Sequence, residues 1–371
     1  PISVRAGTHE YDMVGVHMKF GAQIALDNTL RNIKKFPTIN LTSPWWNQTI
    51  NTMFTYKTVQ YWTTGDITTD YINGLFAMFM DNTLFEQYTG KTTEEMLDEV
   101  LDGKWTLEKV QEYTNGVYED RNNNDARDEG DLVGWYFVDA HSHYGSLCNA
   151  MGYNFTEKSG SKYKLTLVTP ENEYIYSQVN SFVHGGSVLP CSDNIGQLMN
   201  GNCMFSHNLL YSLGTLRSRE ADFSIIPMPK LVETDEYRTP CYDGIEVVGI
   251  VGTEPLDRYD LIGTFAEVYA AMGRKYVTEA LFEVTLKSKY ARNEGSYKCL
   301  DLIRANGYCD FAFCWTSVLN RIDYFAGEAA QFNKASLAVM AAEMTYSVDK
   351  MFDNLYMKLN SFEKEDKTHA E

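Results

Sequence analysis

Positive charge is the scarcest property of this chain of 371 residues. Lys and Arg number 32 against 50 Asp and Glu, which gives a formal net charge of −18. A surface of that sign repels polyphosphate, so we set nucleic-acid binding aside. No apolar run is long enough to cross a membrane. The first residues, 1–5, do not have the pattern of a signal peptide, so either a signal was removed or the chain begins inside a longer protein.

The cysteines and the short motifs are equally uninformative about chemistry. The 7 Cys form no Cys-x-x-Cys pair and no Cys/His spacing typical of zinc. Cys309 and Cys314 are close in sequence, but spacing alone does not decide whether they form a bridge. We expect free, buried thiols. No GxSxG, P-loop or HExxH motif occurs, so no enzyme class and no organic cofactor is indicated.

Size and aromatic content are what the sequence does offer. A chain of this length that is 44% hydrophobic predicts a large α/β domain or two lobes. Charged residues make up only 22%, which argues against wholesale disorder. Aromatic residues reach 13%, with 25 Tyr, and a Tyr side chain combines an apolar face with a polar tip that suits sugars. For any single Tyr, ordinary core packing is the favoured interpretation.

Strands and helices are predicted to alternate along the chain. Segments 11–16, 58–64, 75–80, Leu132–Val138 and 245–251 have the composition of buried strands. Segments 22–36, 92–101, 107–117, 257–272 and 294–306 have the composition of helices. This alternation implies an α/β fold with mainly parallel sheets. Because no repeat or flexible linker is present, two lobes would share crossover segments.

Four segments, in this order, resemble one known family. They are LFEQY with GKWTLEK (84–109), YED with DEGDLVG (118–134), EADFSIIPMPK (220–230) and KSKYARN (287–293). Together they are similar to the family 1 extracellular solute-binding proteins, which include maltose and oligosaccharide receptors. The match runs from about residue 6 to the C-terminal helices. Two positions depart from the family: Met80-Asp81-Asn82 stands where Phe-Asn-Lys is usual, and Asp125 replaces a usual Gly.

The resemblance implies a periplasmic-binding-protein-like fold of type II with two hinged lobes and ligand in the cleft. Lobe 1 would comprise 1–66 and 245–312, and lobe 2 would comprise 67–244 and 313–371. Family members carry a strand, a helix and a strand before the segment that matches residue 11. The resemblance therefore implies that the first βαβ unit of lobe 1, a signal peptide and a lipid-anchor Cys are missing here, along with part of one cleft wall.

The function that the resemblance implies is capture of a carbohydrate, with an oligosaccharide favoured, for an ABC transporter permease. The protein would be extracellular, either on the cell surface as a lipoprotein or in the periplasm, monomeric and not an enzyme. Two alternatives stay open. One is a glycan-processing enzyme with paired carboxylates in a cleft, and the other is a surface glycan-binding or sensing protein without a transporter.

The ligand-binding candidates are polar or aromatic residues near strand ends and expected crossovers, where open α/β sheets bind ligands. Trp315 is the strongest candidate for stacking on a sugar, whereas for Trp62 core packing is slightly favoured over stacking. For the pair Trp45 and Trp46 a packed corner is favoured. Asp66 could accept sugar hydroxyls or cap a helix. The full set is His17, Lys19, Trp62, Asp66, Asp139, His141, His207, Asn208, Tyr242, Asp243 and Trp315.

Two groups of residues could hold a metal. Asp139, His141 and His143 are close in sequence, but this spacing is weak, so ligand contact or helix capping is preferred. An acidic loop has the spacing of a calcium-binding EF-hand, with Asp125 at the usual Gly and Asp in place of the final Glu. The alternative is a solvated turn, and we favour a structural Ca²⁺. The loop positions are Asp120, Asn122, Asn124, Ala126 (through its backbone carbonyl), Asp128 and Asp131.

Overall fold

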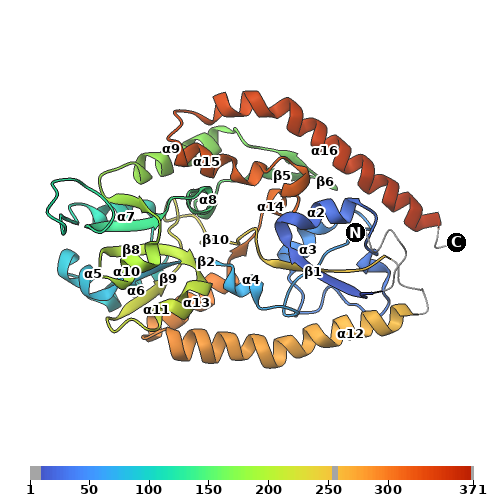
Figure 1. Ribbon diagram of the computed structural model, residues 1–371, viewed down its shortest axis with the longest axis horizontal. Coiled ribbons are helices and arrows are strands. Elements are labelled where there is room, and N and C mark those ends of the chain that lie inside the picture. Colours follow the sequence, from blue (N-terminus) through green and yellow to red (C-terminus); the bar gives the residue numbers. More distant parts are fainter. Residues whose placement is uncertain (1–9, 253–257, 369–371) are drawn as a thin grey trace.

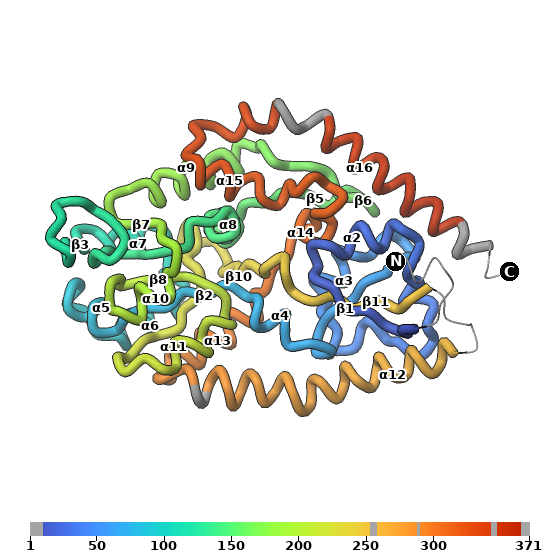
Figure 2. Tube along the Cα trace, viewed as in Figure 1, coloured from blue at the N-terminus to red at the C-terminus, as the bar shows by residue number. Residues whose placement is uncertain are grey.

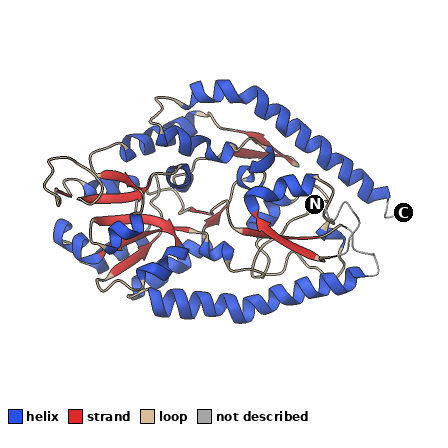
Figure 3. Ribbon diagram, in the orientation of Figure 1, coloured by secondary structure: helices blue, strands red, loops and turns tan. Residues whose placement is uncertain are grey.

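The chain forms two lobes that lie side by side and share several connections (Figure 1). The structure is a computed structural model that describes residues 10–252 and 258–368. In both lobes helices lie outside the strands (Figure 3). The architecture is the two-lobed α/β arrangement that the family resemblance implies. Within the described residues, no helix is both long and apolar enough to cross a membrane.

Lobe 2 is built on a six-stranded sheet of order β3-β4-β8-β2-β9, with β7 also paired to β4. Every residue of β2 is buried, as are almost all of β4, as expected for apolar strands that are covered on both faces. β4 runs parallel to β7 and β8, but β2 runs antiparallel to β8 and β9. The sheet is therefore mixed, and the expectation of mainly parallel sheets was wrong. The strands are β2 (Phe76–Asp81), β3 (Tyr118–Glu119), β4 (Leu132–Val138), β7 (Val188–Cys191), β8 (Cys203–Leu209) and β9 (Phe223–Ile226).

The helices of lobe 2 carry clear start signals in the sequence. Thr92 caps α6 (Thr93–Leu101) in a capping box with Glu95, and Thr106 caps α7 (Leu107–Thr114). Pro170 opens α9 (Pro170–Val183), where its missing N–H costs nothing. The other helices are α5 (Asn82–Thr89), α8 (His141–Ala150), α10 (Asn194–Met199), η2 (Leu210–Ser212), α11 (Leu213–Leu216), α13 (Glu294–Ala305), η7 (Ile322–Tyr324) and α15 (Phe325–Gln331).

Lobe 1 has a smaller strand pair, in which β1 (Met13–His17) runs antiparallel to β11 (Glu246–Ile250). The core beneath it is anchored by Trp62, whose indole N–H donates to the carbonyl of Gly21 at 2.7 Å. The expected helix 22–36 ends much earlier, because Asn28 adopts a left-handed φ of 55°. Segment 58–64 is not a strand, and one bridge, from Thr63 to Val248, pairs its backbone with β11. The helices are α2 (Met18–Leu26), η1 (Ile33–Lys35), α3 (Gln48–Phe54), α14 (Phe311–Cys314) and η6 (Thr316–Val318).

Connections between the lobes run next to one another at the hinge. β10 (Thr239–Pro240) pairs in parallel with β12 (Gly307–Tyr308), and Leu75 bridges Cys241. The first connection also contains α4 (Asp70–Asn73), whose C-terminal Gly74 accepts from the amide of Tyr242 at 2.8 Å. The hinge is therefore a hydrogen-bonded layer and not a set of independent linkers.

A long helix runs beneath both lobes (Figure 2). It starts as α12 (Tyr259–Met272) and continues as the π-helical segments η4 (Gly273–Thr278) and η5 (Ala280–Tyr290). Gly273 permits close packing, since a Cβ there would lie 1.9 Å from the carbonyl oxygen of Asp66. The final helix, α16 (Leu337–Thr368), covers the strand pair β5 (Thr156–Ser159) and β6 (Lys162–Leu165) through the Tyr356 hydroxyl, which donates to the Tyr163 carbonyl.

Two segments do not lie in the lobe that was predicted for them. α13 was placed in lobe 1, but it packs against β9 and α6 of lobe 2. The amide of Ile225 donates to the hydroxyl of Ser296 on this helix at 3.0 Å, which fixes it to the sheet. The segment from 313 was placed in lobe 2, yet its first part, the end of α14 with η6, packs on lobe 1, whereas α15 packs on α8 and α9 of lobe 2. All seven cysteines are free and buried, as expected.

Candidate functional site

The start of α2 is attached to the second interlobe connection by its backbone. The amides of Met18 and Lys19 donate to the carbonyls of Ile245 at 2.8 Å and of Asp243 at 3.0 Å. These bonds satisfy amide groups that the first turn of a helix leaves without partners. They also place the Lys19 ammonium 5.9 Å from the ring centre of Tyr242. Three predicted residues, Lys19, Tyr242 and Asp243, therefore lie together.

Asp243 connects this group to residues that come from lobe 2. Its carboxylate is only 4% exposed and accepts a hydrogen bond from the Tyr324 hydroxyl at 2.8 Å. The Tyr324 ring lies on His141 of α8, with ring centres 3.8 Å apart. We call Lys19, His141, Tyr242, Asp243 and Tyr324 the lobe-junction cluster. It brings one cation, one anion and several ring faces together where the lobes meet.

Charge and burial act in opposite directions on His141. Burial lowers its pKa from the usual value, while the carboxylates of Glu328 and Asp243 oppose that effect. The net direction is downward, so the imidazole is neutral at pH 7 and offers one donor and one acceptor nitrogen. A neutral ring of this kind suits the hydroxyl groups of an uncharged ligand.

A second carboxylate, Asp323, lies next to the cluster. It is 3% exposed and accepts from the Thr316 hydroxyl through Oδ1, while Oδ2 has no hydrogen-bond partner among the described residues. Burial, reinforced by the charge of Asp243, raises the pKa of Asp323 well above its usual range. Just before it, Asn320 and Arg321 both adopt left-handed φ angles, of 56° and 58°. Strained backbone of this kind clusters at functional sites.

The buried aromatic and imidazole candidates are not ligand contacts. Trp62 is 0% exposed, and Trp315 is 2% exposed with its indole N–H bound to the Met53 carbonyl at 3.0 Å. His207 is fully buried and accepts from the Trp135 indole at 3.2 Å. Burial lowers the pKa of His207 far below its usual value. The assignments of Trp315 and His207 to the ligand were wrong because both side chains are part of the core, and the core packing that was slightly favoured for Trp62 is confirmed.

Three other candidates lie outside the cluster's contacts. His17 is exposed and lies beside Phe20, with ring centres 6.4 Å apart. Asp139 is exposed and accepts from the Tyr144 hydroxyl and the Gln331 amide, each at 3.2 Å. Asn208 is half-buried, and its amide donates to Asn194 at 2.9 Å. Their roles in ligand binding stay predictions.

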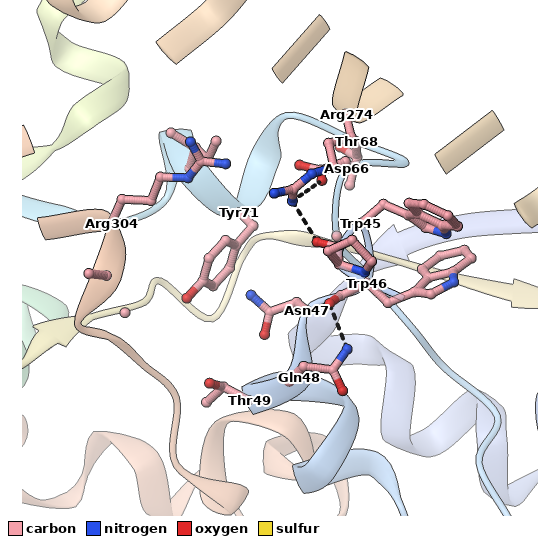
Figure 4. A pocket seen from close by; sticks show the side chains of 15 residues that line it. Trp45, Trp46, Asn47, Gln48, Thr49, Asp66, Thr68, Tyr71, Arg274 and Arg304 are labelled. Atoms are coloured by element: carbon pink, nitrogen blue, oxygen red, sulfur yellow. Dashed lines mark hydrogen bonds and ion pairs between the residues drawn. The ribbon is translucent and has the colours of Figure 1, made fainter. Parts of the chain in front are cut away.

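Asp66 lies at the hinge, in a different environment from the cluster. It forms an ion pair with Arg274 at 3.2 Å and lines a cavity of about 250 Å³ together with Trp45, Tyr71 and Arg304 (Figure 4). The neighbouring Trp46 is 2% exposed and donates to Glu267 at 2.9 Å, which confirms the packed-corner interpretation for this residue.

The acidic loop folds on itself through its own side chains. Asp120 accepts from the amides of Asn123 and Asp125, and the Asn122 and Asn124 amides donate to Asp128. Asp125, at the position of the usual Gly, adopts a left-handed φ of 58°, so the sharp turn is made without glycine. No group of three or more His, Cys, Asp or Glu side chains suited to a metal occurs in the described part of the chain. A Ca²⁺ ion here, which would also draw on amide and backbone oxygens, stays a proposal.

Sequence reasoning missed the residues that complete the cluster. Tyr324 supplies the aromatic face that we assigned to Trp315, and Arg321 lies over the same ring at 4.1 Å. Phe20 is 56% exposed beside Lys19. One signal was available: Phe20 adjoins a predicted ligand residue at the start of a helix. Tyr324 and Asp323 carried no local signal, because only the packing of η7 against α8 brings them to the junction.

The fold is the one found in two-lobed solute-binding proteins. In sequence, the chain matches no family model and no curated protein. In structure, it is similar to the sugar-binding protein MalE from Xanthomonas citri, with a TM-score of 0.67 and 10% identity over 97% of this chain and 88% of that one.

Two further solved structures extend this comparison. UgpB from Mycobacterium tuberculosis, in complex with glycerophosphocholine, aligns with a TM-score of 0.63 and 14% identity over 95% of this chain and 86% of that one. The substrate-binding protein Lmo0181 from Listeria monocytogenes, in complex with cycloalternan, aligns with a TM-score of 0.55 and 11% identity over 97% and 87%. The fold that the family resemblance implied is confirmed.

Proposed function

We propose that the chain is an extracellular receptor that captures a carbohydrate at the lobe junction and passes it to an ABC transporter permease. The observation that carries the proposal is the lobe-junction cluster, because it joins fixed polar groups to aromatic faces. A carboxylate such as Asp243 accepts sugar hydroxyls in strong, charge-assisted bonds. The rings of Tyr242 and Tyr324 suit the apolar C–H faces of a pyranose.

The ligands named for the similar structures support a carbohydrate in this chain. Complexes in this group contain cycloalternan and maltotetraose, both of which are oligosaccharides. One complex contains glycerophosphocholine, so the fold also accommodates other polar molecules. In this chain His141 is neutral near pH 7, and charges of both signs, Lys19 with Arg321 and Asp243 with Glu328, lie around it. That balance favours a neutral, hydroxyl-rich ligand over a charged one.

We propose that the protein binds its ligand without converting it. Two of the carboxylates near the junction are already engaged or buried: Asp243 accepts from Tyr324, and Asp323 is buried with a raised pKa. Neither is placed as the accessible, separate acid and base that glycoside hydrolysis needs. We propose that the protein acts as a monomer outside the cytoplasm, either anchored to the cell surface as a lipoprotein or in the periplasm.

The test is calorimetric titration with a panel of oligosaccharides, on the chain and on two variants. Asp243→Asn keeps the shape of the side chain but removes the charge, so we expect the dissociation constant to rise at least tenfold. Asp98→Asn makes the same charge change on the exposed face of α6 and serves as the control. Chromatography of the mixture checks for products. Equal affinity in both variants would contradict the site, and product release would contradict a binding role.

A further inference from the structure

The hinge cavity beside Asp66 is separate from the lobe-junction cluster and shares none of its residues. Its volume is about 250 Å³, which is enough for a small molecule with some water. Three parts of the chain form its wall: the turn before α3, the first interlobe connection, and the end of α13 with β12. Arg274 of the long helix closes one side (Figure 4).

The cavity holds two guanidinium groups and one carboxylate. Arg274 donates to Asp66 at 3.2 Å and to the Pro44 carbonyl at 2.6 Å. Arg304 lies over the ring of Phe282 at 4.7 Å, and no carboxylate among the described residues pairs with it. A cavity with surplus positive charge is unusual in a chain whose net charge is −18. In Figure 4 the two arginines stand on either side of Tyr71.

Neutral donors add to this positive surface. Burial raises the pKa of Tyr71 well above its usual value. Its hydroxyl therefore keeps its proton, which is available for donation. The side-chain oxygen of Asn47 accepts from the amide of Ile50, so its amide nitrogen is left to face Tyr71. Beside the one carboxylate of Asp66, the wall thus offers two guanidinium groups, a hydroxyl and an amide as donors, and these suit an anion with several acceptor oxygens.

We propose that this cavity binds a small oxyanion, a phosphate or carboxylate group, held between Arg274 and Arg304 with the Tyr71 hydroxyl as a further donor. Guanidinium groups match such oxygens in paired, charge-assisted hydrogen bonds. Arg274 lies on the helix that contacts the first connection at Gly273, whereas Arg304 ends a helix that packs on the lobe 2 sheet. A bound oxyanion therefore connects the two lobes at the hinge.

The test measures binding of inorganic phosphate, sulfate and acetate by calorimetry and thermal shift, against chloride at equal ionic strength. We expect a saturable rise in melting temperature with at least one oxyanion, since a ligand that binds only the folded state stabilises it. Binding of acetate alone identifies a carboxylate site, whereas binding of phosphate or sulfate identifies a site for tetrahedral anions. No saturable response to any of the three would overturn the proposal.

Variants of the cavity residues test whether the oxyanion binds in the cavity. Arg304→Gln is expected to weaken oxyanion binding at least tenfold, whereas Arg217→Gln removes the same charge from an exposed position and should leave binding unchanged. Because Arg304→Gln also loses its contact with Phe282, Tyr71→Phe provides a second probe that keeps the ring and removes only the hydroxyl. A weaker effect, of roughly threefold, is expected there. If both cavity variants bind like Arg217→Gln, the anion lies elsewhere and the assignment is wrong.

Discussion

The strands of the two lobes differ in how deeply they are buried. β2 of lobe 2 is buried at every residue, whereas β1 of lobe 1 is exposed or half-buried at every residue. Lobe 2 can therefore derive its stability from its sheet, through strands that are covered on both faces. Lobe 1 depends instead on anchors beneath its strands, such as Trp62 and the helices α2 and α3. Substitutions in the two sheets should therefore lower the free energy of unfolding by different amounts.

The largest expected effect comes from the centre of the lobe 2 sheet. Phe79 on β2 is 0% exposed, so Phe79→Ala should lower the free energy of unfolding by about 3–5 kcal/mol. Val14→Ala on the half-buried β1 should cost about 1 kcal/mol, because less apolar surface is lost. Urea unfolding followed by fluorescence and circular dichroism measures both. Equal losses would show that the strand pair of lobe 1 is as important as the larger sheet.

The stability of the folded protein should depend on pH because lobe 2 buries histidine side chains. Burial lowers the pKa of His143 in lobe 2 to about 4, below the value near 6.5 of an unfolded chain. As the pH falls from 6.5 towards 4, the unfolded chain takes up a proton that the folded protein does not. Stability is therefore present above pH 6.5 and is lost on acidification, by on the order of 3 kcal/mol for this residue.

Two variants test that dependence by urea unfolding at several pH values. His143→Asn should flatten the loss of stability between pH 6.5 and 4, although buried His207 contributes a loss of the same sign. His17→Asn changes an exposed histidine of lobe 1 and should leave the profile as it is. If both variants keep the wild-type profile, the acid sensitivity arises from other groups.

The sequence predicted lobe 2 more accurately than lobe 1, for a physical reason. The predicted strand Leu132–Val138 matches β4 at both ends, and the helix predicted at 92–101 matches α6 within one residue, since a capping box marks its start. In lobe 1 the helix predicted at 22–36 ended at Leu26 and segment 58–64 formed no strand. Local patterns are decisive where a strand is wholly apolar or a helix is capped. They fail where long-range contacts set the backbone.

At the candidate site, too, some residues could be predicted from the sequence and others could not. Lys19, Tyr242 and Asp243 were predicted because they lie next to strand ends and connections, and the structure brings them together. Trp315 was chosen for its chemistry alone and is part of the core. Tyr324, which replaces it, could not be predicted because its position depends on a left-handed turn at Asn320 and Arg321. Chemistry identifies candidates, but only tertiary packing decides which are accessible.

The acidic loop of lobe 2 should respond to calcium if the proposed site exists. At a Ca²⁺ concentration about a hundredfold above the dissociation constant, binding would stabilise the folded chain by about 2.7 kcal/mol. A chelator should therefore lower the melting temperature, and Asp128→Asn should abolish that shift. Asp98→Asn, an equal change of charge on α6, should preserve it. A melting temperature that is unaffected by chelation would leave the loop as a turn held by its own hydrogen bonds.

A small effect is expected at the lobe junction, where neither sheet contributes. Tyr324→Phe removes the hydroxyl that donates to Asp243 and leaves a 4% exposed carboxylate with one partner fewer. The expected loss is about 1–2 kcal/mol, because hydrogen bonds to charged groups contribute somewhat more than neutral ones. Tyr211→Phe is the matched control, since Tyr211 is 76% exposed. Urea unfolding measures the stability of both variants. Equal stabilities would mean that water replaces the Tyr324 hydroxyl as a partner of Asp243. The cluster would then be more accessible to water, and to a ligand, than its burial indicates.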